Sequence, residues 1–468
     1  MERLALEEIE RWQKERRKPL MVYGARQVGK TYLVKDIFAE RHYKGNYIYV
    51  DFKKDSAMRD FVNEGGVCDA KKIIEYLSLR EGRDIDGSTL LIFDEVQEAL
   101  PIITAMKYFK QDYPEIPVIC TGSMVRIKLK RKANNDKRHK EESFFFPVGC
   151  VDTIMVYPLS FEEFLLNANP RLRKAILSSY EAMKPLDPAI HKMALDLLYR
   201  YLLVGGMPED VQLFLEGKSL LQVRQNAISL FDDYLNDMEL YQASRESLIR
   251  AKSIFNSIYT QLSKESKDFK PSLLDSSLRS RDLKTPLEWL ETASLVYCSR
   301  QVKEQVSIPL KEGDGNNYRI YILDLGFLAY QSDIDLTTFV SSDAENTLSG
   351  VFFENYVANE LQAYGFPLFY WKGKGGSEFE FLIESEGKVI PVDVKKKGGS
   401  LKSLSKYKER NSCQKAVKIS MNHLGYDEES KILTIPLYMV FAWLGGLRKD
   451  KANLRLSLLP LSGIDSRS

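Results

Sequence analysis

The chain has 468 residues, with 67 Lys and Arg against 65 Asp and Glu, and a formal net charge of +2. This balance excludes a surface that is basic throughout, although it allows local basic patches. An apolar share of 44%, with 27 Gly and 17 Pro, excludes a mostly disordered chain. Five scattered Cys without a CxxC pair argue against a disulfide scaffold and a Cys/His zinc site.

The length predicts about three domains, since a typical domain has roughly 150 residues. The first 18 residues are charged and helix-like, unlike a signal peptide. No stretch reaches the ~18 consecutive apolar residues of a membrane-spanning helix. We therefore expect a cytoplasmic protein without a membrane partner.

The N-terminal third alternates short apolar runs with helical patterns, which is typical of an α/β fold with a parallel sheet. We predict a helix at Tyr32–Arg41 and strands at Pro19–Tyr23, Tyr47–Phe52, Thr89–Phe93 and Pro117–Thr121. These runs are as apolar as strands that are covered on both faces. A further strand pattern covers Val151–Leu159, after which Ser160 is placed to cap a helix.

The pattern is helical from Phe161 to about Leu262 and is interrupted at Gly205–Pro208. The following segment has short helical patterns and a strand-like run at Leu295–Cys298, an order similar to a small winged-helix unit. A new α/β pattern begins near Ser342. It predicts helices at Phe352–Ala363 and Leu401–Arg410, and strands at Leu368–Trp371, Glu378–Ile383, Val389–Val394 and Ala416–Ser420.

The segment Gly24–Thr31 matches the phosphate-binding pattern G-x-x-x-x-G-K-[ST] and lies between a predicted strand and a predicted helix. Its glycines let backbone N–H groups point into one concavity, and the helix adds its positive N-terminal end. Lys30 can then reach the β- and γ-phosphates, and the Thr31 hydroxyl can ligate Mg²⁺. A tight turn before a helix is the alternative. The expected nucleotide-binding residues are Gly24, Ala25, Arg26, Gln27, Val28, Gly29, Lys30, Thr31 and Tyr32.

Two further strand ends support this interpretation. Asp94 follows an apolar strand and is placed to reach the Mg²⁺ shell, and Glu95 is placed to orient or deprotonate a water. An ordinary acidic strand end is the alternative. The next strand ends in Thr121-Gly-Ser123, where a hydroxyl can sense the γ-phosphate or belong to a plain turn. We therefore predict Lys30, Glu95 and Ser123 as catalytic.

The motifs GARQVGKT, LIFDEVQ, TGS, PLSFEEFL and GGMPE occur in the order seen in prokaryotic AAA-type ATPases with a C-terminal domain of unknown function and nuclease-like fold. This resemblance implies ATP with Mg²⁺ as cofactor, and it places Pro208 in a lid motif near the nucleotide. A helix-ending Gly turn followed by Pro is the alternative. The limits that we expect are 1–165 for a P-loop core, 166–240 for a helical lid, 241–340 for a winged-helix-like segment, 341–445 for a nuclease-like domain and 446–468 for a tail.

The chain departs from its relatives before PLSFEEFL. They often have P-x-G-[KR], whereas this chain has Cys150 in place of the basic residue. Any contact of that basic residue with phosphate or a neighbouring subunit is therefore not carried over. The sequence does not assign an arginine finger; Arg126 is the first guess and Arg131 the second. An oligomer is compatible with the resemblance, but no interface is assigned.

The C-terminal part brings acids and a lysine together. Asp393 and Lys395 are two apart on a predicted strand, so their side chains project to the same face. Glu380 can approach them across a hairpin, and Glu354 on the preceding helix is a third carboxylate. Such a set suits Mg²⁺-assisted phosphodiester hydrolysis, with Glu380 and Asp393 as metal ligands. It resembles the PD-(D/E)xK nuclease superfamily, with Glu380 where Asp is usual and Asp393 where Glu is frequent.

Three interpretations of this set stay open: an active nuclease, a nuclease fold that only binds, and a coincidental charged hairpin. The stretches Arg126–Lys140 and Lys388–Arg410 each have eight Lys or Arg, as nucleic-acid binding or a solvated loop would allow. The first hypothesis is therefore an ATPase that couples hydrolysis to a nuclease-like, nucleic-acid-associated module. The second is a slow nucleotide-sensing switch that binds nucleic acid or a partner without cleavage. A ring-forming remodelling ATPase is a third.

Overall fold

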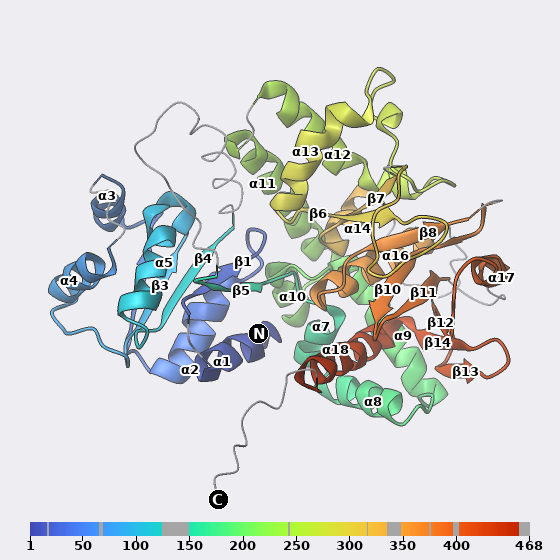
Figure 1. The fold of residues 1–468 in the computed structure, drawn as a ribbon, viewed down its shortest axis with the longest axis horizontal. Coiled ribbons are helices and arrows are strands. Elements are labelled where there is room, and N and C mark those ends of the chain that lie inside the picture. The colour runs from blue at the N-terminus through green and yellow to red at the C-terminus, as the bar shows by residue number, and fades with distance from the viewer. Residues whose placement is uncertain are drawn as a thin grey trace, which may run out of the picture. The chain divides into compact units, whose positions relative to one another are not determined.

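The computed structural model describes residues 1–15, 18–64, 69–123, 149–241, 244–315, 317–334, 348–373, 376–395 and 402–457. They form two compact units (Figure 1). The N-terminal unit comprises Met1–Leu159 and Glu288–Leu295, and the C-terminal unit comprises Ser160–Leu287 and Val296–Ser468.

The N-terminal unit is built on a parallel sheet of five strands, in the order β2-β3-β4-β1-β5. Each predicted strand is confirmed within a few residues. The three inner strands β1, β3 and β4 are buried on both faces, whereas the edge strands β2 and β5 are partly exposed. The strands are β1 (Leu20–Tyr23), β2 (Tyr47–Asp51), β3 (Leu90–Asp94), β4 (Val118–Gly122) and β5 (Asp152–Met155). The helices are α1 (Ala5–Glu15), α2 (Glu40–Tyr43), α3 (Ser56–Glu64), α4 (Ala70–Glu81) and α5 (Pro101–Asp112).

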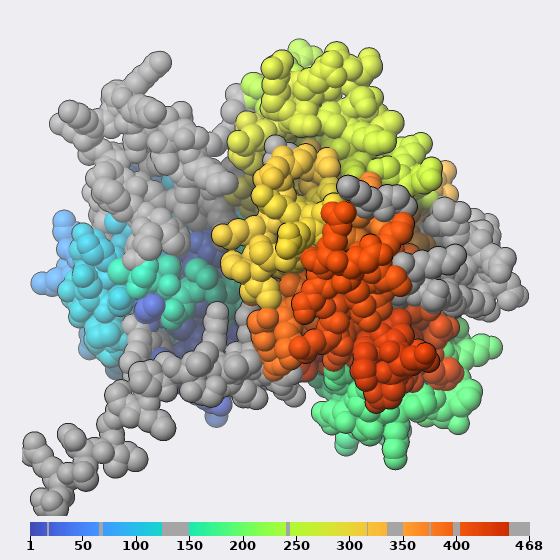
Figure 2. Space-filling view, turned by 45° about the vertical axis from the view of Figure 1, so that its right-hand side comes forward, coloured from blue at the N-terminus to red at the C-terminus, as the bar shows by residue number. Residues whose placement is uncertain are grey.

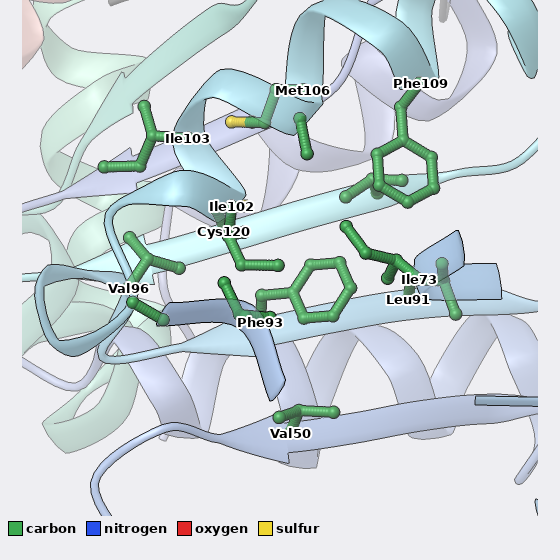
Figure 3. Close-up of a cluster of buried hydrophobic side chains, with 14 of the residues drawn as sticks. Val50, Ile73, Leu91, Phe93, Val96, Ile102, Ile103, Met106, Phe109 and Cys120 are labelled. Atoms are coloured by element: carbon green, nitrogen blue, oxygen red, sulfur yellow. The ribbon is translucent and has the colours of Figure 1, made fainter. Parts of the chain in front are cut away.

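One face of this sheet forms the core with α3, α4 and α5 (Figure 3). Phe93 on β3 lies at its centre and stacks on Phe52, with ring centroids 5.9 Å apart. Ile73 from α4 and Phe109 from α5 pack onto the same strands. Each such buried side chain stabilises the fold by about 1.5–3 kcal/mol. This packing holds the carboxyl ends of β3 and β4 in place.

The helix predicted at Tyr32–Arg41 is present, but its first part is a π-helix over Tyr32–Ala39 that continues into α2. Trp12 of α1 packs against its Phe38, with ring centroids 6.5 Å apart. Wider turns of this kind occur frequently at functional sites. The sequence pattern cannot distinguish a π-helix from an α-helix, because both bury one apolar stripe.

The C-terminal unit begins with helices that are mostly amphipathic. Ser160 caps the first of them as predicted, since its hydroxyl accepts from the N–H of Glu163, whose carboxylate accepts from the N–H of Ser160. The helices are α7 (Phe161–Ala168), α8 (Pro170–Glu181), α9 (Pro188–Val204), α10 (Pro208–Leu215), α11 (Leu220–Tyr241), α12 (Arg245–Leu262), α14 (Leu325–Gln331), α16 (Leu348–Ala363), α17 (Lys402–Lys408) and α18 (Val440–Ser457). Helix α13 (Ser280–Thr292) is divided between the two units. Helix α18 continues through residue 446, where the predicted tail begins.

Two sheets organise the rest of the C-terminal unit. The first has the order β7-β6-β8-β9 and the second the order β10-β11-β12-β14-β13. The strands of the first are β6 (Val296–Gln301), β7 (Tyr318–Ile322), β8 (Phe369–Lys372) and β9 (Glu378–Phe379). Those of the second are β10 (Phe381–Ser385), β11 (Lys388–Val394), β12 (Ala416–Ser420), β13 (Gly425–Asp427) and β14 (Ile432–Pro436).

The single strand predicted at Glu378–Ile383 is wrong, because Glu380 separates β9 from β10 and each belongs to a different sheet. The strand β6, from the segment predicted to resemble a winged helix, pairs with β8 from the segment predicted to be nuclease-like. On the face in Figure 2, the yellow residues near 300 accordingly lie against orange residues of the later segment. Residues from these two predicted segments therefore share one sheet.

The helices α7 and α16 meet at a buried carboxylate. Glu360 on α16 accepts the N–H of Phe161 at 2.7 Å, at the first turn of α7. Burial raises the pKa of Glu360 to about 8, although the Phe161 N–H opposes this shift. The folded chain therefore keeps a proton here that the unfolded chain releases at a lower pH.

We expect the stability of the C-terminal unit to fall as pH rises from about 5 to 8. A carboxyl with a raised folded pKa binds more protons in the folded state, so the free energy of unfolding decreases by up to ~1.4 kcal/mol per pH unit. Urea unfolding at pH 5, 7 and 9 measures this slope. Glu360→Gln is expected to flatten it and the exposed control Glu265→Gln to leave it unchanged; equal slopes for all three chains would contradict the assignment.

Candidate functional site

The loop Gly24–Thr31 joins β1 to the π-helix and turns sharply. Gly24 and Gly29 have φ of 151° and 87°, and Gln27 also has a positive φ of 58°. A Cβ at Gly24 would lie 2.3 Å from the carbonyl oxygen of Val156. A side chain at position 24 would therefore displace either the loop or the residue that follows β5.

The Lys30 side chain crosses this loop and is buried. Its Nζ donates to the carbonyl of Ala25 at 2.7 Å and to that of Gly24 at 3.2 Å. Burial lowers the pKa of Lys30 to about 8, although Glu95 and Asp94 act in the opposite direction. The ammonium is thus held among loop groups that a phosphate can replace as its partners.

Asp94 at the end of β3 gathers the hydroxyls of the site. Its Oδ2 accepts from Thr31 Oγ1 at 2.7 Å and from the Tyr49 hydroxyl at 2.8 Å. Its Oδ1 accepts from the Thr121 hydroxyl and, at 2.9 Å, from the N–H of Glu95. The Thr31 hydroxyl and the Asp94 carboxylate are oxygen donors in direct contact, so they fit a Mg²⁺ ion as adjacent ligands.

Glu95 has left-handed backbone angles, with φ 55° and ψ 42°. Such a conformation costs a non-glycine residue on the order of 1–3 kcal/mol and occurs often at functional sites. The Gln97 amide donates to the Glu95 carboxylate. The strained backbone and this hydrogen bond together set the direction of the Glu95 side chain.

The two hydroxyls at the end of β4 differ in their contacts. Thr121 reaches Asp94, whereas the buried Oγ of Ser123 has no hydrogen-bond partner among the residues described. The geometry therefore joins Thr121 to the site and leaves Ser123 as a predicted γ-phosphate sensor. The candidates Arg126 and Arg131, and the basic stretch around them, lie outside the described residues.

Sequence reasoning missed Tyr49 and Arg3. The Tyr49 hydroxyl binds Asp94, and its place on the strand beside β3 was the available signal. Arg3 is buried, and its guanidinium donates to the carbonyl of Val28 at 2.9 Å and to that of Tyr157 at 2.7 Å. It thereby ties the loop to the segment after β5, a contact that no local pattern indicates. The predicted Tyr32 is 44% exposed, and its hydroxyl accepts from the terminal amine at 3.0 Å.

The Gly205–Pro208 segment lies in the C-terminal unit. Gly205 ends α9 with φ 78°, and Pro208 begins α10, as the helix-ending alternative expects. The Asp324 carboxylate accepts from the N–H of Gly206 at 2.6 Å, and a Cβ at Gly205 would lie 2.3 Å from its Oδ1. The glycine is therefore required by this contact.

The predicted acidic cluster of the C-terminal unit is assembled as the spacing indicates. The Lys395 ammonium lies 3.0 Å from Asp393 Oδ1 and 3.7 Å from Glu380 Oε1. Glu380 also accepts the N–H of Val394 at 3.1 Å. Glu354, on α16, is buried with them, and proximity to Glu380 contributes to its raised pKa.

The pKa values in this cluster diverge. Burial raises the pKa of Asp393 to about 7, with the Glu380 charge acting in the same direction. Burial also raises the pKa of Glu354. Although Glu380 is buried too, Lys395 and Lys267 hold its pKa below the ordinary value. The cluster therefore carries fewer negative charges near neutral pH than three free carboxylates would.

Two cations of the cluster were missed by sequence reasoning. Lys267, between α12 and α13, forms an ion pair with Glu354. Arg319 on β7 is fully buried, and its guanidinium lies 2.8 Å from Glu378. Both belong to segments distant in sequence from the acids. Among the residues that the structure describes, no group of three or more His, Cys, Asp or Glu is arranged to hold a metal ion.

Comparison with known families supports the reading of the first unit. Residues 16–165 match the model of an AAA domain. This part of the chain is therefore similar to AAA domains, and its loop has the P-loop pattern. Residues 195–338 and 349–439 match two domains of unknown function, DUF8612 and DUF4143. A search of curated proteins finds no match.

Among solved structures, the chain is similar to a Walker-type ATPase, PABY2304 of Pyrococcus abyssi. The identity is 15%, over 71% of this chain and 96% of that chain, with a TM-score of 0.41. This similarity is too low to support a functional argument. Within the residues that match the AAA model, Thr31 contacts Asp94, and Lys30 is held by the carbonyls of its own loop. No helix within the described ranges is long and apolar enough to cross a membrane.

Proposed function

We propose that the protein binds ATP and hydrolyses it with Mg²⁺ at the Gly24–Thr31 loop of the AAA domain. Lys30 neutralises the β- and γ-phosphates, Thr31 and Asp94 ligate Mg²⁺, and Glu95 orients the attacking water. ATP is favoured over GTP by the family, and no N-K-x-D-type guanine reader lies near the core in the sequence.

The observation that carries this proposal is the set of contacts at Asp94. The Asp94 carboxylate accepts hydrogen bonds from the Thr31 hydroxyl, next to Lys30, and from the Thr121 hydroxyl on β4. An enzyme catalyses phosphoryl transfer mainly through positioned charges and hydrogen bonds, because the protein itself has little covalent chemistry to do. A loop amine, two hydroxyls and a carboxylate, all held by one parallel sheet, meet this requirement.

Phosphate release from ATP tests the proposal. The wild-type chain is expected to turn over ATP with Mg²⁺ and to stop in excess EDTA. Asp94→Asn is expected to lower the rate at least about tenfold, because it removes a charged metal ligand. Asp112→Asn, at the exposed end of α5, is the matched control and is expected to keep the wild-type rate. Absence of wild-type turnover with ATP would refute the proposed hydrolysis.

We further propose that hydrolysis is coupled to the C-terminal unit, which acts as a nuclease-like, nucleic-acid-associated module. The acids Glu354, Glu380 and Asp393 beside Lys395 support this reading. The second candidate is a module that binds nucleic acid or a partner without cutting. The pairing of Lys267 with Glu354 favours it, since that carboxylate is already engaged by the protein.

Plasmid cleavage with Mg²⁺ or Mn²⁺ separates the two candidates. Cutting by the wild-type chain that is lost in Lys395→Ala would establish the first. ATP turnover without any cutting that depends on Lys395 would support the second. Lys388→Ala, on an exposed position of β11, controls for a general loss of positive charge.

A further inference from the structure

The acidic cluster of the C-terminal unit is closed by a cation that belongs to the chain. We infer that the Lys267 ammonium takes the place of a divalent metal ion beside Glu354, so that the folded chain does not take up a metal at this cluster. The inference does not depend on ATP hydrolysis, and of the two candidates for the C-terminal unit it supports the second, a module that binds without cutting.

Lys267 is in direct contact with the carboxylate that a metal would need. Its Nζ pairs with Glu354 Oε1, and the Glu354 side chain is only 4% exposed. A buried carboxylate is costly unless it is paired, and a lysine ammonium meets this requirement without a metal. Glu354 Oε1 is thus engaged by a cationic N–H donor, and a Mg²⁺ or Mn²⁺ ion ligated there would be repelled by the Lys267 ammonium.

The segment that presents Lys267 is held on its C-terminal side by independent contacts. Phe269 donates its N–H to the carbonyl of Tyr318 at 2.8 Å, and the two rings stack with centroids 5.7 Å apart. Asp268 accepts from the Tyr370 hydroxyl at 2.9 Å and pairs with Lys372 at 2.9 Å. These contacts fix the backbone of the residues that follow Lys267. The ion pair with Glu354 therefore does not require an otherwise free loop to become ordered.

The other two carboxylates are engaged in the same way. Lys395 lies between Asp393 and Glu380, at 3.0 and 3.7 Å, and the N–H of Val394 occupies the second oxygen of Glu380. Across the neighbouring ion pairs, five carboxylates face four cations. The acids are Asp268, Glu354, Glu378, Glu380 and Asp393, and the cations are Lys267, Arg319, Lys372 and Lys395.

This balance does not fit a divalent ion. Even with all five acids ionised, the four bases leave only one net negative charge, so a divalent metal would make the network positive unless a lysine withdrew. A hard cation such as Mg²⁺ also requires near-octahedral oxygen ligands at about 2.0–2.1 Å. At this cluster Glu354 Oε1 and Asp393 Oδ1 each face an ammonium and Glu380 Oε2 accepts an N–H, whereas the buried Asp393 Oδ2 has no hydrogen-bond partner among the described residues. Removal of Lys267 would free one carboxylate and open a place for the metal.

A Mn²⁺ titration of the full-length chain without nucleotide tests the inference by calorimetry. The wild-type chain is expected to show no Mn²⁺ site that Glu354→Gln removes. Lys267→Met keeps the apolar stem but not the charge. This variant is expected to gain one Mn²⁺ site that depends on Glu354, with a Kd at least tenfold below that of any Mn²⁺ binding by the wild-type chain at this cluster. The gain is expected to disappear in the Lys267→Met/Glu354→Gln chain. Lys264→Met, an exposed neighbour, is the control and is expected to match the wild type.

Two results would overturn the inference. One is a stoichiometric Mn²⁺ site in the wild-type chain that Glu354→Gln abolishes. The other is a folded Lys267→Met chain that gains no Mn²⁺ binding. If Lys267→Met does not fold, thermal melting of the Lys267→Met/Glu354→Gln chain gives the test. This double variant is expected to fold, because both charges of the pair are then absent. If the double variant shows no cooperative melting transition either, the pairing of Lys267 with Glu354 is rejected.

Discussion

Replacing Glu95 with glutamine is expected to lower ATP turnover by about 10²–10⁴-fold while ATP binding persists. Glutamine keeps the shape of the side chain and its contact with Gln97, but it cannot accept a proton from water. The change therefore removes a group needed in the transition state and leaves the phosphate loop intact. Phosphate release and fluorescent-ATP titration measure the two quantities separately.

Lys30→Ala supplies the contrast to Glu95→Gln. It removes the ammonium that spans the loop, so both affinity and turnover are expected to fall. Glu75→Gln, exposed on α4, is expected to change neither. A Glu95→Gln chain that hydrolyses ATP at the wild-type rate would exclude Glu95 as the residue that activates water. A Lys30→Ala chain with unchanged affinity would move the nucleotide site away from this loop.

Replacing Arg319 with methionine is expected to lower the stability of the C-terminal unit by about 3–5 kcal/mol. The guanidinium is fully buried, pairs with Glu378 at 2.8 Å and lies 4.3 Å from the centre of the Tyr370 ring. Methionine fills much of the volume but leaves the Glu378 carboxylate without its cation and Asp268 with Lys372 alone. Thermal and urea unfolding measure the loss.

Arg281→Met is the matched control for Arg319, because its side chain is 87% exposed and its ion pair with Asp282 is long, at 3.8 Å. A change of less than ~1 kcal/mol is expected there. A similar small change at Arg319 would show that the buried network repacks around the missing charge. Replacing Glu378 with glutamine together with Arg319→Met is expected to recover part of the loss.

The strands and the phosphate loop of the N-terminal unit could be predicted because their signals are local. The inner strands are runs of apolar residues buried on both faces, and the P-loop motif requires a fixed order of small and charged residues. The capping box at Ser160 is equally local, since both partners lie within four residues. The adjacency of Asp94 and Thr31 also follows, because the carboxyl ends of parallel strands share one edge of the sheet.

The break at Glu380 could not be predicted. Its flanking residues alternate as in one continuous strand, and only the partners show that β9 and β10 belong to different sheets. The partners of the acidic cluster were equally hidden. Lys267 and Glu354 are 87 positions apart, and no sequence pattern around either residue indicates that they form a pair.

The sequence by itself determined the parallel α/β core, the phosphate loop and the identity of the acids in the C-terminal unit. These properties depend on the period of apolar residues and on short motifs, which are set by neighbours along the chain. Only the tertiary structure decided that Tyr49 and Thr121 bind Asp94, and that Lys267 and Arg319 neutralise the acidic cluster. Burial of a charge requires a partner, but any lysine or arginine can supply it, so its origin is settled only when the chain packs.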